Sequence, residues 1–430
     1  MRTRTKIAAA ATAGLVALGL AATELIIRAA NGPAGQDAAA QQGEATSKPV
    51  VPPSFTVDTT LTPAVATVPG LHDGEPPRPV GRLVNDGTTS DLVLDELVVI
   101  AQDRAGLQPV LDRWHATVAD EDSDDDGGTF LVRFDPAAVG ADELSALATN
   151  MAAVEPGLSG VTAANSEQTL KLVAALAAET ADHGTVVAPN WLTTASSIED
   201  GRAIEGLDSK PNAFDWSFIS AGSEMDTGVG AAWQLMEQHG KTKNKVPIMI
   251  DDRGFQHNND FPEVKKLRKA QWGDTDPTWK WHGTNTALTA MGRIDNQFGT
   301  AGVAGQVGEL IAVYHADGTY DALKRVKDMV GEEHPAILSM SWLSETTLAQ
   351  SGTRATYDRF LKKVRDRGVL AFAAAGNYHR NVDSENCIGK TCWEGMLNYP
   401  CESAYVICVG GLASNSKWKA EDSSYGSDTD

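Results

Sequence analysis

The stretch VPIMIDDRG, Val246–Gly254, joins a short apolar run to two aspartates, an arginine and a glycine. A continuous apolar run bounded by polar residues is typical of a strand that is buried on both faces, as in a parallel sheet. In such sheets the functional residues gather at the carboxyl ends of the strands. The stretch therefore predicts an α/β fold with functional residues directly after Ile250.

The surrounding chain repeats this pattern of apolar strands and amphipathic helices. The predicted helices cover residues 228–239, 281–292, 320–330 and 355–368, and the predicted strands cover 246–250, 309–316, 336–342, 369–376 and 405–412. Strands and helices that alternate at this spacing predict a doubly wound, mostly parallel sheet. We place this domain at residues 216–430.

Residues 92–193 predict a second, smaller α+β domain. Its predicted strands are 96–101, 129–135, 159–165 and 185–191, and its predicted helices are 106–118, 141–154 and 166–179. Residues 31–91 are rich in Pro, Ala, Gly and Thr and predict a disordered linker. The polar residues 194–215 predict an exposed junction between the two domains.

An acidic run, DEDSDDDGG, occupies Asp120–Gly128 inside the smaller domain. It matches the first half of a calcium-binding EF-hand loop, but the twelfth position is Arg133, where a bidentate Glu is required. We therefore predict a solvated acidic hairpin here and no calcium site.

The first 30 residues have the pattern of a secretory signal peptide. A basic start with Arg2, Arg4 and Lys6 precedes an apolar run over residues 7–22, and small residues follow. An uncleaved membrane anchor is the alternative, although Glu24 and the alanine content speak against it. No later segment is long and apolar enough to span a bilayer. We expect a secreted, extracellular protein that meets the membrane only through its signal peptide.

All four cysteines lie in one short segment, at Cys387, Cys392, Cys401 and Cys408. In an oxidising compartment they predict two local disulfides with three alternative connectivities. A zinc site is the competing interpretation, but the segment has no CxxC pair and no paired histidines nearby.

The net charge of −21 over 430 residues argues against nucleic acid as a partner, because phosphate binding needs clustered Lys and Arg. A high negative charge also favours solubility and weak self-association, so we expect a monomer.

Five blocks in the larger domain resemble the subtilases, the subtilisin-like serine peptidases, in the right order. They are VPIMIDDRGFQHNNDF (246–261), HGTNTALTAMGRIDNQFGTAGVAGQVGELIAVYHADG (282–318), ILSMSWLS (337–344), VLAFAAAGN (369–377) and NYPCESAYVICVGGLASNS with SSYGS (398–427). One His-Gly-Thr alone would be weak, whereas five ordered blocks are a specific signal. The resemblance implies a subtilisin-like fold and hydrolysis of protein or peptide substrates.

The resemblance also assigns roles to residues. His282 would be the general base, and Asp252 would hold its tautomer and stabilise the imidazolium, with Asp251 as an open alternative to Asp252. Asn377 would donate a hydrogen bond to the oxyanion. The substrate-binding residues would pair by backbone with an extended peptide, and they are Ser341, Trp342 and Leu343. The other histidines considered are expected to be surface or packing residues: His115, His257, His315 and His379.

Two positions depart from the family pattern. Asn285 stands where the family has a second His, and the Gly-Thr-Ser-x-Ala box that carries the nucleophile does not occur. The Gly-Thr pairs of the larger domain are not followed by Ser; they begin at Gly283, Gly299, Gly318 and Gly352. We therefore expect a subtilisin-like domain that is incomplete at its C-terminus and a chain that is inactive as it stands.

The segment TVVAPNWL, Thr185–Leu192, resembles the end of subtilase prodomains, which assist folding and inhibit the enzyme with their C-terminal strand. The leading hypothesis is a secreted serine endopeptidase precursor whose own prodomain is a partner. The alternative is a non-catalytic pseudopeptidase that binds peptides or proteins, although the combination of Asp252, His282 and Asn377 speaks against it. We expect no required cofactor and no catalytic metal. Subtilases often bind structural calcium, but no ligands are assignable here.

Overall fold

The computed structural model describes residues 56–85, 88–140, 161–181, 186–195, 227–268, 279–296, 299–346, 350–382, 385–388, 391–394, 397–413 and 418–426. The chain divides into compact units of residues 1–50 and 51–430, and every described residue belongs to the second unit. Within these residues, no helix combines the length and the apolar character that a membrane crossing requires. The predicted signal peptide, the predicted helix 141–154 and residues 196–215 of the predicted junction lie outside the described residues.

The described residues from 227 onward contain a six-stranded sheet in which every pair of neighbours is parallel. Its strands, in spatial order, are β11 (Glu263–Arg268), β12 (Gly308–Tyr314), β10 (Val246–Asp252), β13 (Ile337–Met340), β15 (Leu370–Ala374) and β19 (Ile407–Val409). The strand order departs from the chain order, so helices must cross over between the strands. The predicted doubly wound parallel sheet is confirmed.

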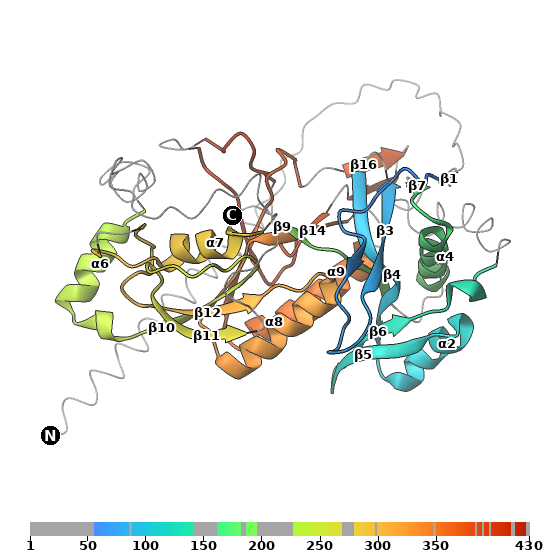
Figure 1. Ribbon diagram of the computed structural model, residues 1–430, viewed down its shortest axis with the longest axis horizontal. Coiled ribbons are helices and arrows are strands. Elements are labelled where there is room, and N and C mark those ends of the chain that lie inside the picture. The colour runs from blue at the N-terminus through green and yellow to red at the C-terminus, as the bar shows by residue number, and fades with distance from the viewer. Residues whose placement is uncertain are drawn as a thin grey trace, which may run out of the picture. The chain divides into compact units, whose positions relative to one another are not determined.

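Helices cover both faces of this sheet (Figure 1). Ile248 and Ile250 of β10 pack against α7 (His282–Met291), whereas Met249 belongs to the cluster formed with α8 (Thr319–Glu333) and α9 (Gln350–Arg365). Successive strand residues face opposite sides, so the unbroken apolar run of β10 supplies two cores at once. Helix α6 (Val229–Gln238) and the 3-10 turn η3 (Lys241–Lys243) precede β10.

The described residues from 56 to 191 contain a second sheet, mostly antiparallel. Its spatial order is β1 (Thr56–Val57), β7 (Val161–Ala164), β3 (Arg78–Asn85), β4 (Thr88–Ala101), β6 (Gly127–Arg133) and β5 (Thr117–Asp124), with β2 (Thr67–Val68) on β3 and β8 (Val186–Trp191) on β4. The helices are α2 (Arg104–Trp114) and α4 (Glu167–Ala181), and η1 (Pro136–Ala138) follows β6. Leu97 and Val99 of β4 pack with these helices, whereas Val98 packs with α8 and α9.

Part of the predicted linker over residues 31–91 is wrong, because β1, β2 and β3 lie inside it. β3 pairs antiparallel with β4, from Val80↔Val93 to Asn85↔Thr88, and Val80 and Leu83 are buried. The start of a strand tolerates proline, because the missing N–H costs no hydrogen bond in the interior of the ladder. Pro79 therefore does not prevent β3, and the α+β fold begins before residue 92.

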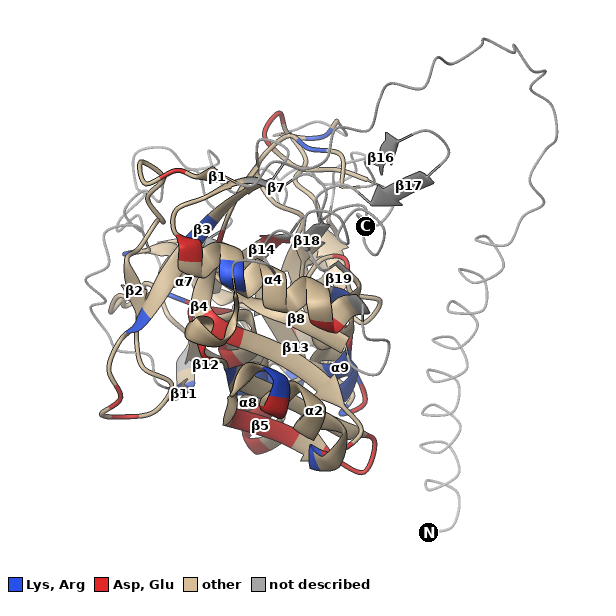
Figure 2. Cartoon of the chain, turned by 90° about the vertical axis from the view of Figure 1, so that its right-hand side faces the viewer, with Lys and Arg blue, Asp and Glu red and all other residues tan. Residues whose placement is uncertain are grey.

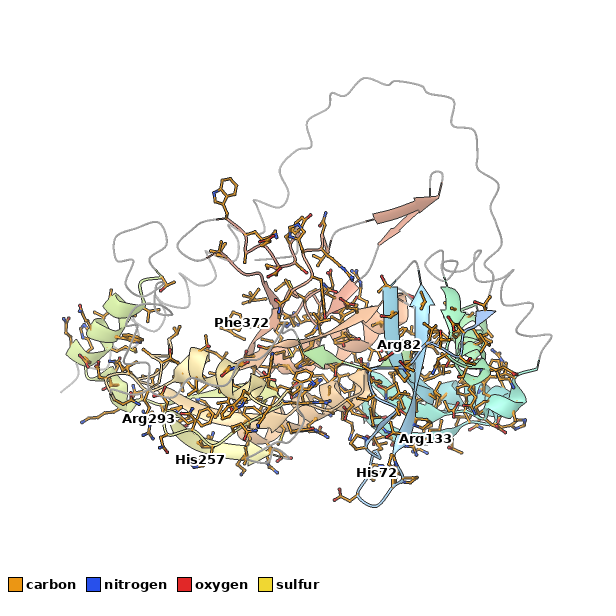
Figure 3. The ribbon with its side chains drawn as sticks, turned by 45° about the horizontal axis from the view of Figure 1, so that its top comes forward. His72, Arg82, Arg133, His257, Arg293 and Phe372 are labelled. Atoms are coloured by element: carbon orange, nitrogen blue, oxygen red, sulfur yellow. A yellow bond between two sulfur atoms is a disulfide. The ribbon has the colours of Figure 1, made fainter. Side chains whose placement is uncertain are left out.

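The acidic run forms the predicted hairpin, and Asp124, Asp125 and Asp126 are exposed at its tip, but the hairpin is not solvated throughout. Residues 120–124 belong to β5, Asp122 is only 8% exposed, and its carboxylate pairs with Lys327 of α8 and Lys363 of α9. Figure 2 shows the acidic band of β5. Arg133, labelled in Figure 3, pairs with Glu75 and Glu96 and not with the hairpin. Distant cations therefore compensate the acidic charge.

Candidate active site

The candidate site begins at the carboxyl end of β10. Asp252 is the last residue of β10 and is fully buried, and His282 opens α7 with 6% of its surface exposed. His282 Nδ1 lies 2.6 Å from Asp252 Oδ1, which also accepts the Arg253 backbone N–H at 2.7 Å. A carboxylate at this distance fixes the proton on Nδ1 and stabilises a positive charge on the ring. The contact therefore holds the His282 ring in the orientation that a general base would need.

Small residues hold the strand end against the helix start. Gly254 has φ +71°, and a Cβ there would lie 1.4 Å from the Trp279 carbonyl oxygen. The Gly283 N–H donates to the Arg253 carbonyl at 2.5 Å, and a Cβ on Gly283 would lie 2.6 Å from that same oxygen. The Asp-x-Gly and His-Gly-Thr motifs therefore need their glycines so that two backbones can approach.

Thr284 completes this junction. Its hydroxyl donates to the Gly254 carbonyl at 3.1 Å and accepts the Gln256 N–H at 2.7 Å. One side chain thus satisfies two backbone groups of the loop that follows β10, and the loop is fixed relative to α7.

Asp251 and Asp252 point to opposite faces of the sheet, as neighbours in a strand must. Asp251 Oδ2 lies 3.0 Å from His315 Nδ1 and accepts the Trp342 indole N–H at 2.8 Å. Asp252 contacts His282, so the geometry favours Asp252 over the alternative that the sequence left open.

Arg253, the unusual residue between Asp252 and Gly254, has partners on the neighbouring segment. Its Nε donates to the His315 carbonyl at 3.1 Å, and its Nη2 lies 2.6 Å from Asp317 Oδ1. Its guanidinium also lies over the rings of Trp279 and Tyr314. Arg253 therefore ties the end of β10 to the segment after β12.

The predicted substrate-binding residues lie at the end of β13 and the start of β14 (Trp342–Thr346). Ser341 is half-buried, and Trp342 and Leu343 are fully buried. β14 pairs antiparallel with β18 (Leu397–Tyr399) on one side and with β9 (Thr194–Ala195) on the other. The predicted substrate strand thus carries an added strand from the α+β region.

A segment that ends in β9 lies between two parts of the α/β region. Leu192 bridges antiparallel to Gly318, and the Thr193 N–H donates to the Asp317 carbonyl at 3.0 Å. On the other side Thr194 pairs with Leu343 and Ala195 pairs with Trp342. Residues 192–195 are therefore an extended segment that pairs through its backbone on both sides.

Asn377 follows β15 at the same edge of the sheet and is half-buried. Gly376 before it has φ +100°, and the Gly376 carbonyl accepts the Ser424 N–H at 2.9 Å. β15 and β10 both flank β13 in parallel, so Asn377 and Asp252 follow strand ends that point the same way.

The cysteine prediction is met in one pair. Cys401 and Cys408 form a disulfide with their Cα atoms 4.7 Å apart. In the hairpin of β16 (Glu385–Ile388) and β17 (Thr391–Glu394), the backbone of Cys387 lies opposite that of Cys392. The side chains of this second pair lie outside the described residues.

Of the four histidines expected at the surface or in packing, three are exposed: His115, His257 and His379. His257, labelled in Figure 3, lies in the loop after β10. His315 is fully buried beside the candidate site, and burial lowers its pKa although Asp251 acts in the opposite direction. Its position at the carboxyl end of the predicted strand 309–316 was the one available signal. No three His, Cys, Asp or Glu side chains among the described residues are grouped as metal ligands.

Comparison with models of known families matches residues 209–430 to the subtilase family. A comparison with curated proteins found no match. Among solved structures, the nisin leader peptidase from Lactococcus lactis is 14% identical with a TM-score of 0.34, covering 46% of this chain and 66% of that one. The epidermin leader peptide processing serine protease from Staphylococcus aureus is 12% identical with a TM-score of 0.42, covering 78% and 73%. Fervidolysin from Fervidobacterium pennivorans is 14% identical with a TM-score of 0.41, covering 75% and 43%.

Proposed function

Because the chain belongs to the subtilase family, we propose that it is the precursor of a serine endopeptidase that uses Asp252, His282 and a serine. The buried 2.6 Å contact between His282 Nδ1 and Asp252 Oδ1 carries this proposal. It fixes the imidazole orientation that a Ser-His-Asp triad requires. A binding protein without catalysis would not need this contact.

In the proposed reaction, His282 Nε2 takes the proton of the serine hydroxyl as the oxygen attacks the substrate carbonyl. Asp252 stabilises the imidazolium, and the Asn377 side chain donates to the oxyanion of the tetrahedral intermediate. His282 then gives its proton to the leaving amine, and water hydrolyses the acyl-enzyme by the same steps. The family's Gly-Thr-Ser-x-Ala motif does not occur in these 430 residues. We place the serine in a segment outside them.

The α+β region acts in this proposal as an inhibitory prodomain. Its last described residues, Leu192–Ala195, hold the backbone positions that an extended substrate would use. The N-terminal signal pattern, together with the disulfide between Cys401 and Cys408, supports export to an extracellular location.

The test uses the complete gene product, assayed on denatured casein. His282→Ala should abolish hydrolysis, and Asp252→Asn should lower kcat by about 10⁴-fold because the imidazole loses its tautomer. Asp251→Asn tests the alternative assignment, since Asp251 contacts His315 and not His282, and it should lower kcat at least about 100-fold less than Asp252→Asn does. Equal losses in the two Asp variants would contradict the assignment. Peptide binding without any hydrolysis would instead favour the pseudopeptidase.

A further inference from the structure

Backbone pairing holds a peptide in the groove, but side-chain pockets decide which peptide fits. We call Leu192–Ala195, which pairs on both sides, the seated segment. Within it, the Thr193 side chain enters such a pocket and is only 6% exposed. Its hydroxyl oxygen lies 2.5 Å from His315 Nε2, 3.2 Å from the Ala316 carbonyl and 3.1 Å from the Asp317 carbonyl. The pocket is therefore polar around the Thr193 hydroxyl.

His315 is held rigidly in the wall of this pocket. Its Nδ1 lies 3.0 Å from Asp251 Oδ2, and its backbone N–H donates to the Asp252 carbonyl at 2.9 Å. The Trp342 ring packs against the imidazole with ring centroids 4.2 Å apart, and its indole donates to the same Asp251 oxygen. The ring therefore has little freedom to turn away from the occupant.

The hydrogen-bonding pattern selects a hydroxyl. The Asp251 carboxylate accepts from Nδ1–H, which leaves Nε2 as an acceptor facing the occupant. A Thr or Ser hydroxyl has one hydrogen and gives it to Nε2, the nearest of its three acceptors, whereas the methyl group of Val at that position cannot donate. Since His315 is fully buried, water does not replace the missing partner.

We propose that His315 is a specificity-determining residue that selects Ser or Thr over aliphatic side chains at the substrate position filled by Thr193. Asp251 is its positioning residue. This inference rests on the proposed peptidase function, because it treats the seated segment as a substrate analogue. It identifies the preferred substrates as extended peptides with a hydroxyl residue at this position.

The first experiment measures amide hydrogen exchange in the intact chain. Thr193→Val keeps the side-chain shape and should lower the protection factor of the residue 193 amide by about 10-fold to 100-fold. Thr193→Ser, the matched control, should stay within about 3-fold. In a His315→Leu background the difference in protection between Thr and Val should shrink to about 3-fold or less, because only the longer contacts to the Ala316 and Asp317 carbonyls remain for the hydroxyl. Equal protection of Thr193 and its Val variant in the wild-type background would overturn the proposal.

The second experiment uses the enzyme that the complete gene yields after processing. Peptides spanning residues 190–200, with Thr, Ser or Val at the Thr193 position, are compared by kcat/KM. The Val peptide should be cut about 10-fold to 100-fold less well, and His315→Leu should reduce this preference to about 3-fold or less. Equal kcat/KM values for the three peptides would also overturn it. If no peptide is cut, the peptidase proposal fails, whereas the exchange experiment still decides the pocket.

Discussion

Replacing Asp122 by Asn tests how the α+β region is held on the helices of the α/β region. The Asp122 side chain is 9% exposed and pairs with Lys327 and with Lys363, whose Nζ lies 2.7 Å from Oδ2. Breaking a buried ion pair costs about 3–5 kcal/mol, whereas an exposed pair contributes about 0–1 kcal/mol. The lysine side chains are 13% and 19% exposed, so this site falls between these limits. We expect Asp122→Asn to destabilise the chain by about 2–3 kcal/mol.

The assay is urea unfolding of the intact chain in a double-mutant cycle with Lys363→Met. A coupling free energy of about 1–2 kcal/mol is expected if the carboxylate and the ammonium act on each other. Asp125→Asn is the matched control, because Asp125 is exposed at the tip of the same hairpin and its removal changes the net charge equally. That variant should stay within about 0.5 kcal/mol of wild type. A coupling near zero, or equal effects of the two Asn variants, would refute the reasoning.

The same contact predicts a pH dependence. Burial opposes ionisation of Asp122, but hydrogen bonds from Lys327 and Lys363 outweigh it and lower its pKa. A lowered pKa in the folded state contributes stability above the unfolded value, about 3.9, and this contribution is lost as the pH falls through the folded pKa. The stability difference between wild type and Asp122→Asn should therefore shrink below about pH 4.

Further outcomes are expected elsewhere in the chain. Gly254→Ala should inactivate the complete enzyme, because its Cβ would meet the Trp279 carbonyl. Gly368→Ala, at φ +80° with open space around it, should lower the free energy of unfolding by only about 1–2 kcal/mol. Measurements of kcat and of urea midpoints check both. Cys401→Ser should lower the free energy of unfolding, measured by urea titration, by about 2–4 kcal/mol. An unchanged free energy of unfolding would show that the Cys401–Cys408 disulfide does not stabilise the fold. Residues 1–430 alone should not hydrolyse casein, and a rate near that of the complete protein would disprove the missing serine. N-terminal sequencing of the processed enzyme should find a start within residues 191–215, and a start before Pro189 would exclude this.

The sheet could be predicted because its signal is local. The apolar run of β10 supplies Ile248 and Ile250 to one face and Met249 to the other, and no information from elsewhere in the chain is needed to read this. The choice between Asp251 and Asp252 could not be made in the same way. Alternation puts the two carboxylates on opposite faces, but only the placement of α7 decides which face holds His282.

The partners of His315 and of Asp122 could not be predicted from the sequence, for a shared reason. Asp251 precedes His315 by 64 residues and Thr193 precedes it by 122, and Lys327 follows Asp122 by 205. From the sequence alone, His315 is expected to be a surface or packing residue and Asp122 to be a solvated charge. Their partners lie in other elements, so nothing near either residue indicates the contact. The β3 strand was missed because the Pro-rich composition of residues 31–91 predicted a linker, although a strand start accepts proline.

The two sets of contacts suggest how a precursor segment can inhibit an enzyme without being consumed like a substrate. Residues 192–195 use backbone bonds and one hydroxyl, which any suitable peptide can also offer. The β5 carboxylates add ion pairs to α8 and α9 outside the groove, which a short peptide cannot form. In the proposed mechanism a cleaved substrate would leave the groove, whereas the α+β region would stay bound through the ion pairs of β5. Release of the α+β region should therefore become faster at high salt or low pH, which weaken the ion pairs of β5. Turnover of peptides should depend instead on the pocket at His315.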